Sequence, residues 1–151
     1  MSLESDIAIL RNVPLFEGLA SDQLRLLAFG AERRRLSAGE IVFRQDAQAD
    51  AGFVIASGTV VLVSQGRDRQ KAVGSFGPGT LLGELALITE TTRPASAKAE
   101  TSCELLRITR PMFRRMLEEY PEYAAGLHER LKLQFAEMTR QILALEDRFS
   151  G

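Results

Sequence analysis

Near the middle of the chain the sequence reads GELALITETTRPASA, residues 83–97. Most of these residues are small or apolar, as in a buried segment, yet an acid stands near the start, Glu84, and an arginine, Arg93, follows nine residues later. A buried charge is costly unless it is paired. Either the two side chains pair with each other or face water, or they flank a bound ligand.

The ligand interpretation follows from the chemistry of each residue. Gly83 lets a ligand approach the backbone closely, and the next residues, ELALI, can form one helical turn with free N–H groups at 84–86. Arg93 offers a planar fork that matches phosphate oxygens. Glu84 can only accept hydrogen bonds, so we expect it to bind a neighbouring hydroxyl such as a ribose 2′-OH. A phosphate beside a ribose hydroxyl indicates a nucleotide, although this chemistry alone leaves both interpretations open.

On both sides of this segment the residue pattern is typical of a β-rich fold. From Arg35 to Arg107 short β-like runs alternate with turn residues, which is typical of a compact antiparallel roll or barrel. Helical patterns precede these runs, with Ser21 as the expected N-cap of the second helix. Helical patterns also follow them, with Thr109 as a cap and Pro121 at the start of a long helix.

These patterns predict one domain over residues 1–151. Its expected fold is mainly β with flanking α, an antiparallel, jelly-roll-like β-roll with an N-terminal helical segment and two C-terminal helices. The expected divisions are N-terminal helices over 1–34, the roll over 35–108 and C-terminal helices over 109–149.

The last helix carries a second pattern, an apolar heptad repeat. We call these residues the heptad stripe: Leu131, Phe135, Met138, Ile142, Leu145 and Phe149. The stripe is either the side of a helix packed on its own domain or one strand of a two-stranded coiled coil. The pattern favours the coiled coil, and hence a homodimer formed through this helix.

Composition limits the class of function. The 151 residues suffice for one domain, and 45% hydrophobic with 26% charged residues is typical of a soluble globular protein. With a net charge of −1, no global field attracts nucleic acid, so no nucleic-acid partner is expected. The single cysteine, Cys103, excludes a disulfide within the chain and a multi-cysteine zinc site, and it fits a reducing compartment.

Membrane insertion and catalysis are not expected either. The N-terminal residues MSLESDIAILRN carry acids where a signal peptide needs positive charge, and the longest apolar stretch, residues 52–63, is too short to span a bilayer. The chain has one histidine, so no clustered metal site is predicted. No nucleophile stands with a base at a catalytic spacing. We therefore predict a cytoplasmic, non-enzymatic protein without a metal.

Several segments resemble the cyclic-nucleotide-binding domain family, which includes the regulatory subunits of cyclic-AMP-dependent protein kinase and the bacterial catabolite activators. The stretch GELALITETTRPASAKAE resembles the family's phosphate-binding cassette. The N-terminal NVPLFEGLASDQLRLLA resembles its helical segment, and LSAGEIVFRQDAQADAGFVIASGTVVLV and FGPGTLLGELAL resemble its strands. The resemblance covers about residues 12–118 and favours the nucleotide interpretation.

The resemblance implies roles for the cassette residues. Glu84 would hold the ribose 2′-OH and Arg93 the cyclic phosphate. The backbone N–H groups of Leu85 and Ala86 would contact the phosphate, beside Gly83. Ala95 would line the pocket.

The resemblance also implies residues around the base. Val61 and Val73 match positions of the roll that flank the base, although as alternating strand residues they could equally belong to the core. Leu131 or Phe135, near the start of the heptad stripe, would cap the base.

Two departures from the family pattern lie in the loops. Pro94 follows the arginine where the family often donates a backbone N–H to the phosphate, and proline has none. In the family a hydroxyl at this position tends to accompany cyclic GMP, so cyclic AMP is the expected ligand and cyclic GMP the other candidate. Asp46 replaces a glycine that is usual in the first turn of the roll, and aspartate tolerates left-handed geometry.

The expected function is a non-enzymatic cyclic-nucleotide sensor that signals through a partner protein or through its own dimerisation. The alternative is a degenerate roll that no longer binds nucleotide and serves as a dimerisation or protein-interaction module, which Pro94 favours. A transcription regulator is disfavoured, because the chain ends at Gly151 without room for the DNA-binding domain of the catabolite activators.

Overall fold

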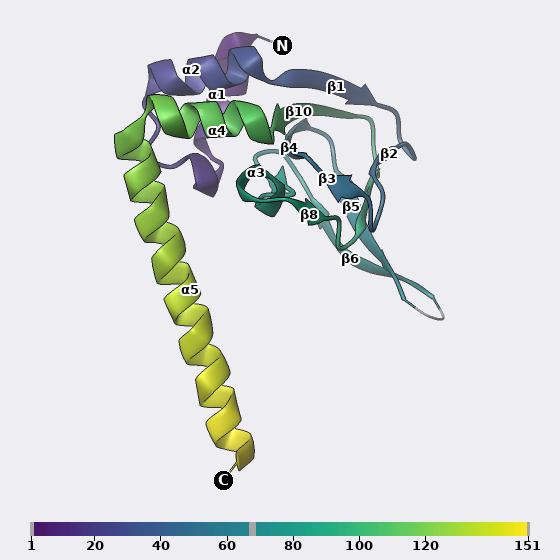
Figure 1. The fold of residues 1–151 in the computed structure, drawn as a ribbon. Coiled ribbons are helices and arrows are strands. Elements are labelled where there is room, and N and C mark those ends of the chain that lie inside the picture. The colour runs from purple at the N-terminus through teal and green to yellow at the C-terminus, as the bar shows by residue number, and fades with distance from the viewer. Residues whose placement is uncertain (1, 67–68, 151) are drawn as a thin grey trace. The chain divides into compact units, whose positions relative to one another are not determined.

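The computed structural model describes residues 2–66 and 69–150, and the side chains as far as residue 144. The chain divides into two compact units, Met1–Met116 and Leu117–Gly151, which are described separately below. The first unit contains the N-terminal helices and all the strands (Figure 1).

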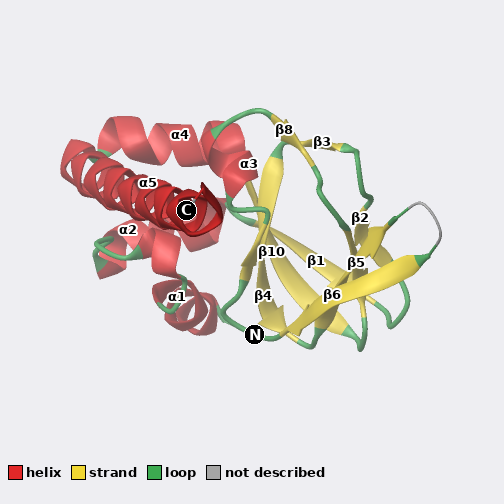
Figure 2. Cartoon of the chain, turned by 90° about the horizontal axis from the view of Figure 1, so that it is seen from below, coloured by secondary structure: helices red, strands yellow, loops and turns green. Residues whose placement is uncertain are grey.

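The N-terminal segment is helical, as predicted, and Figure 2 shows its two α-helices on one side of the strands. Its elements are α1 (Leu3–Arg11), a 3-10 helix (Pro14–Phe16) and α2 (Ser21–Gly30). The prediction of Ser21 as the N-cap of α2 is wrong by one residue, because the cap is Ala20. The Ser21 hydroxyl instead accepts a hydrogen bond from Arg11 Nη2 at 2.6 Å. The N–H of Ala20 donates to Gln23 Oε1 at 2.9 Å, so the Gln23 side chain accepts a hydrogen bond from a free N–H at the start of the helix.

The strands form two four-stranded antiparallel sheets, ordered β1-β10-β4-β7 and β2-β9-β5-β6, and a two-stranded ribbon, β3-β8. This arrangement confirms the predicted β-roll with flanking helices. The bounds are β1 (Glu32–Leu36), β2 (Ile41–Phe43), β3 (Gln48–Ala49), β4 (Ala51–Ser57), β5 (Val60–Gln65), β6 (Gln70–Phe76), β7 (Leu81–Leu82), β8 (Thr91–Thr92), β9 (Ser96–Ala99) and β10 (Cys103–Thr109).

The first strand begins earlier than the predicted roll boundary at residue 35. It begins at Glu32, and Arg33 already pairs with Leu106 of β10. Arg33 also joins this edge to α1, because its Nη2 donates to the carboxylate of Asp6 while its Nη1 donates to Glu104 Oε2 at 2.7 Å. Arg33 therefore links the N-terminal helical segment to the roll through these hydrogen bonds.

The core of the roll is apolar and combines alanines with larger side chains. Its buried cluster comprises Ala51, Phe53, Ile55, Val60, Leu82, Ala97, Ala99, Cys103 and Leu105. Burying a large apolar side chain contributes about 1.5–3 kcal/mol to stability. Within the described part of the chain, only Asp6 and Arg93 are buried charged side chains, at 7% and 4% exposure. Asp6 is paired with Arg33. The burial of the Arg93 charge, in contrast, requires an explanation.

Two helices follow the last strand. The helix α4 (Arg110–Glu119) begins after Thr109, whose hydroxyl accepts from the N–H of Met112 at 3.3 Å, as the predicted cap should. The long helix α5 (Pro121–Ser150) also matches its prediction. None of the helices described is long and apolar enough to cross a membrane.

The heptad stripe lies on α5. Leu131 is partly exposed, whereas Phe135, Met138 and Ile142 are 72%, 59% and 55% exposed. The side chains of Leu145 and Phe149 lie outside the described residues.

Candidate functional site

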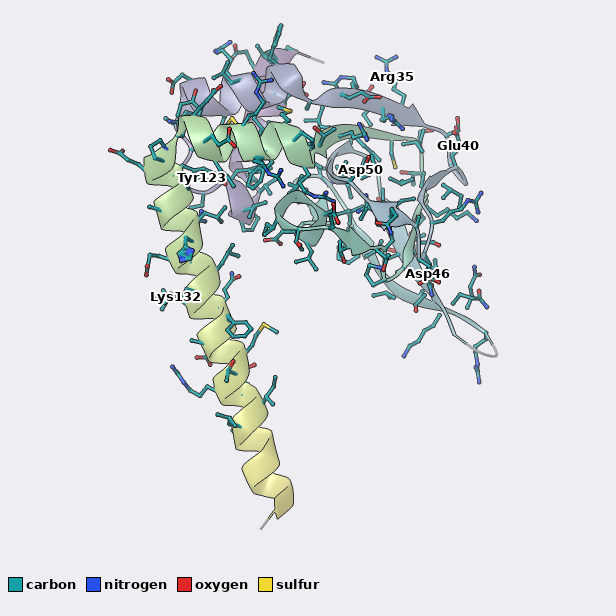
Figure 3. All side chains as sticks on the ribbon, viewed as in Figure 1. Arg35, Glu40, Asp46, Asp50, Tyr123 and Lys132 are labelled. Atoms are coloured by element: carbon teal, nitrogen blue, oxygen red, sulfur yellow. The ribbon has the colours of Figure 1, made fainter. Side chains whose placement is uncertain are left out.

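The backbone of Arg93 is hydrogen-bonded to the loop that precedes β3. Its N–H donates to the carbonyl of Ala47 at 2.9 Å, and its own carbonyl accepts from the N–H of Asp46 at 2.7 Å. Asp46, labelled in Figure 3, has a φ of +70°, so aspartate adopts the left-handed geometry expected from the sequence. These two bonds fix where the Arg93 side chain enters the roll.

The guanidinium of Arg93 is buried and forms no ion pair with an acid among the described residues. Its Nη2 donates to the carbonyl of Ala51 at 2.7 Å. Among the described residues, Nε and Nη1 have no hydrogen-bond partner at all. The guanidinium carbon lies 4.2 Å from the centroid of the Phe43 ring, within the range of a cation–π contact. The Phe53 ring lies farther away, at 5.7 Å, so two aromatic rings and one hydrogen bond hold the cation, and two of its nitrogens are left free.

Electrostatics mark this group as an uncompensated positive charge. Burial lowers the pKa of Arg93 from its ordinary value; the nearby acid Asp50 opposes this, and repulsion from Arg107 adds to it. Asp50, also labelled in Figure 3, already accepts from Arg107 Nη2 at 3.3 Å. An arginine nevertheless stays protonated at neutral pH. An anion that reached its free donors would therefore be bound favourably.

A cavity of about 300 Å³ opens beside these free donors. The structure brings all seven predicted cassette residues to its lining, namely Gly83, Glu84, Leu85, Ala86, Arg93, Pro94 and Ala95. The sequence did not indicate the others, which are Phe43, Ala49, Leu62, Leu82, Thr91 and Thr92.

Glu84 and Arg93 do not pair with each other. In the described part of the chain, no ion pair joins the two side chains, and Glu84 is exposed while Arg93 is buried. The interpretation that they pair is therefore wrong. Glu84 remains available as a hydrogen-bond acceptor at the mouth of the cavity.

Only glycine fits at position 83. Gly83 has a φ of +79°, a conformation that residues with a side chain rarely adopt. A Cβ built there would collide with Nη1 of Arg93. The missing side chain thus lets the arginine reach the cavity, as well as letting a ligand approach.

The turn that follows is α3 (Leu85–Ile88), in agreement with the helical turn predicted there. Its first N–H groups are not equivalent. The N–H of Ala86 donates to the carbonyl of Gly83 at 3.0 Å, so this donor is already engaged. Among the described residues, the N–H of Leu85 has no acceptor.

The predicted roll positions beside the base, Val61 and Val73, stay predictions. Val61 and Val73 are absent from the cavity lining, and Val73 is 58% exposed. Leu62, the neighbour of Val61, lines the cavity instead. Leu131 and Phe135 lie on α5, in the second compact unit, and their contact with the base stays a prediction. Within the described residues, no group of three or more His, Cys, Asp or Glu side chains could hold a metal ion.

Comparison with known proteins identifies the class to which this fold and site correspond. Residues 33–120 match the model of the cyclic nucleotide-binding domain. The chain therefore belongs to the cyclic nucleotide-binding domain family, and the resemblance noted from its sequence is confirmed.

Three similar proteins illustrate the range of this family. A cyclic nucleotide-binding-like protein from Brucella abortus has 48% sequence identity and a TM-score of 0.70, over 75% of this chain and 97% of that structure. The cyclic AMP receptor protein of Thermus thermophilus is 32% identical over 143 residues, 91% of this chain and 65% of the receptor. Lysophospholipase nte1 of Aspergillus terreus is 31% identical over 116 residues. That match covers 76% of this chain but spans only 8% of the lysophospholipase.

Proposed function

We propose that the cavity binds a cyclic nucleotide and that the chain acts as a non-enzymatic, cytoplasmic sensor. The observation that carries this proposal is the state of Arg93, which is 4% exposed with Nε and Nη1 free of partners. A buried cation without an acid is costly, and a phosphate in the cavity would compensate it.

The shape and polarity of the cavity support a nucleotide as the source of that phosphate. Its volume of about 300 Å³ suits a small ligand, and its lining is mainly apolar with a few polar groups. The free donors of Arg93 and the N–H of Leu85 would bind the cyclic phosphate, while Glu84 would accept from the ribose 2′-OH. Ala95, which is buried, would line the sugar side.

Cyclic AMP is the preferred ligand in this proposal, ahead of cyclic GMP. Pro94 lines the cavity and offers neither an N–H nor a hydroxyl to a guanine nucleotide. The similar protein from Thermus thermophilus is a cyclic AMP receptor protein.

Ligand binding would change how α5 binds a partner, which is either a downstream protein or a second copy of this chain. The exposed residues Phe135, Met138 and Ile142 supply apolar area that pairing would remove from water. With ligand bound, Leu131 or Phe135 would cap the base and so couple binding to pairing of the helix.

One observation favours a second candidate, a roll that no longer binds nucleotide and serves as an interaction module. Pro94 has no N–H, and the N–H of Ala86 is engaged with Gly83. Of the N–H groups expected to be free at residues 84–86, that of Ala86 is then unavailable to a phosphate.

Calorimetric titration with cyclic AMP, cyclic GMP and linear 5′-AMP distinguishes the two candidates. The sensor requires saturable binding of cyclic AMP, weaker binding of cyclic GMP, and weakening by Arg93→Lys, because a single ammonium cannot replace the fork. The matched control is Arg69→Lys, at an exposed arginine, which should bind as the wild type does. Absence of binding by every nucleotide would favour the interaction module.

A further inference from the structure

Arg110, the first residue of α4, binds two walls of the cavity although it is not part of the lining. Its Nε donates to the carbonyl of Ala86 at 2.8 Å, and its Nη2 donates to the carbonyl of Ala49. Ala86 belongs to α3 and Ala49 to β3, and both line the cavity. One side chain therefore connects the turn that follows Gly83 to the opposite ribbon.

The guanidinium is well placed for this task because the residue is fixed at its backbone as well. The N–H of Arg110 donates to the carbonyl of Asp50, directly after β3, at 2.9 Å. The side chain is partly buried and reaches the two carbonyls with different nitrogens. A lysine has one ammonium on a flexible stem and cannot reproduce this planar arrangement.

A chain of hydrogen bonds leads from Arg110 to the cavity. The peptide unit whose carbonyl belongs to Ala86 carries the N–H of Leu87, which donates to the carbonyl of Glu84 at 3.1 Å. The peptide unit of that carbonyl carries the N–H of Leu85, which has no acceptor in the described part of the chain. Bonds in such a chain polarise one another, with a strengthening of about 10–30% per bond. A cation at one end thus makes the N–H at the other end a stronger donor.

From these contacts we propose that Arg110 is a positioning residue of the anion site. It holds α3 against β3, and it orients and strengthens the Leu85 N–H for the anion. The inference rests on the proposed function, because the cyclic phosphate is the anion concerned. Arg93, buried with two free donors, independently marks the same cavity as an anion site.

The first part of the test uses the protein without ligand. Proton–nitrogen NMR compares the wild type with Arg110→Met, Arg110→Lys and the control Arg114→Met, at an exposed arginine of the same helix. The Leu85 amide proton should move to lower chemical shift in Arg110→Met, by a smaller amount in Arg110→Lys, and remain unchanged in Arg114→Met. An unchanged Leu85 resonance in folded Arg110→Met would overturn the relay. If the methionine variant does not fold, the same comparison is decided on the lysine variant.

The second part measures cyclic AMP affinity by calorimetry in the same four proteins. The dissociation constant should rise at least about tenfold in Arg110→Met, equivalent to about 1.4 kcal/mol, and less in Arg110→Lys. Arg114→Met should bind as the wild type does. Equal affinity of wild type and Arg110→Met would refute the positioning role. If the wild type binds no cyclic AMP, the proposed function fails, whereas the ligand-free Leu85 resonance still decides whether Arg110 orients that donor.

Discussion

The guanidinium of Arg93 lies over the ring of Phe43, with 4.2 Å between the guanidinium carbon and the ring centroid. The aromatic face partly compensates the buried cation, whose Nε and Nη1 have no hydrogen-bond partner among the described residues. Two nitrogens of the buried guanidinium therefore remain able to donate hydrogen bonds to an anion.

This contact predicts that Phe43→Leu weakens both folding and ligand binding. Loss of the cation–π contact should cost about 0.5–2 kcal/mol of unfolding free energy. Cyclic AMP affinity should fall as well, because Arg93 is no longer held in place. Urea unfolding and calorimetry measure the two effects, with Phe43→Tyr as the control that keeps the ring. Wild-type affinity in Phe43→Leu would show that the aromatic face does not position the arginine.

Gly83→Ala should damage the site through Arg93. The new Cβ would clash with Nη1 of Arg93, and the positive φ adds strain of roughly 1–2 kcal/mol. We expect lower thermal stability and weaker cyclic AMP binding. Gly77→Ala is the matched control, since a Cβ there meets nothing within 4 Å. Equal behaviour of the two variants would contradict the close packing of Gly83 against the arginine.

Arg93→Met should separate stability from binding. Replacing a buried, unpaired cation with an apolar side chain of similar length should stabilise the ligand-free protein by about 1–4 kcal/mol. Cyclic AMP should then no longer raise the melting temperature, whereas at a hundred times its dissociation constant it stabilises the wild type by about 2.7 kcal/mol. A destabilised methionine variant would mean that the bond to Ala51 outweighs the burial cost of the charge.

The heptad stripe predicts the oligomeric state. Sedimentation equilibrium should show a dimer at micromolar concentration, and Ile142→Asp should give monomers because it places a charge within the stripe. Leu143→Asp tests whether the effect is specific, since Leu143 is equally exposed, at 55%, but lies outside the stripe. A monomeric wild type, or identical behaviour of the two variants, would leave the stripe without a role in pairing.

The sequence was sufficient to predict the cassette because its chemistry is local. Gly83, Glu84 and Arg93 lie within eleven residues, and the chemistry of each residue type fits one part of a nucleotide: close backbone approach, a ribose hydroxyl and a phosphate. The β-roll was predictable because its longer strands alternate with clear turn residues. The helix boundary at Ser21 was harder to predict, since the distant residue Arg11 takes up the hydroxyl that would have capped the helix.

The remaining lining residues could not be predicted from local patterns. Ala49 and Thr91 meet through two-residue strands, which are too short to show an alternation. Leu62 lines the cavity whereas its neighbour Val61 does not, because neighbouring strand residues face opposite sides of the sheet. The register shift between Leu62 and Val63 adds to this difficulty.

The structure of the chain with cyclic AMP bound tests the central claim most directly. We predict that the cyclic phosphate lies in the cavity with its oxygens about 2.7–3.2 Å from Nε and Nη1 of Arg93. A nucleotide bound elsewhere, with these two nitrogens still unpaired, or no bound nucleotide at a saturating concentration, would contradict the account.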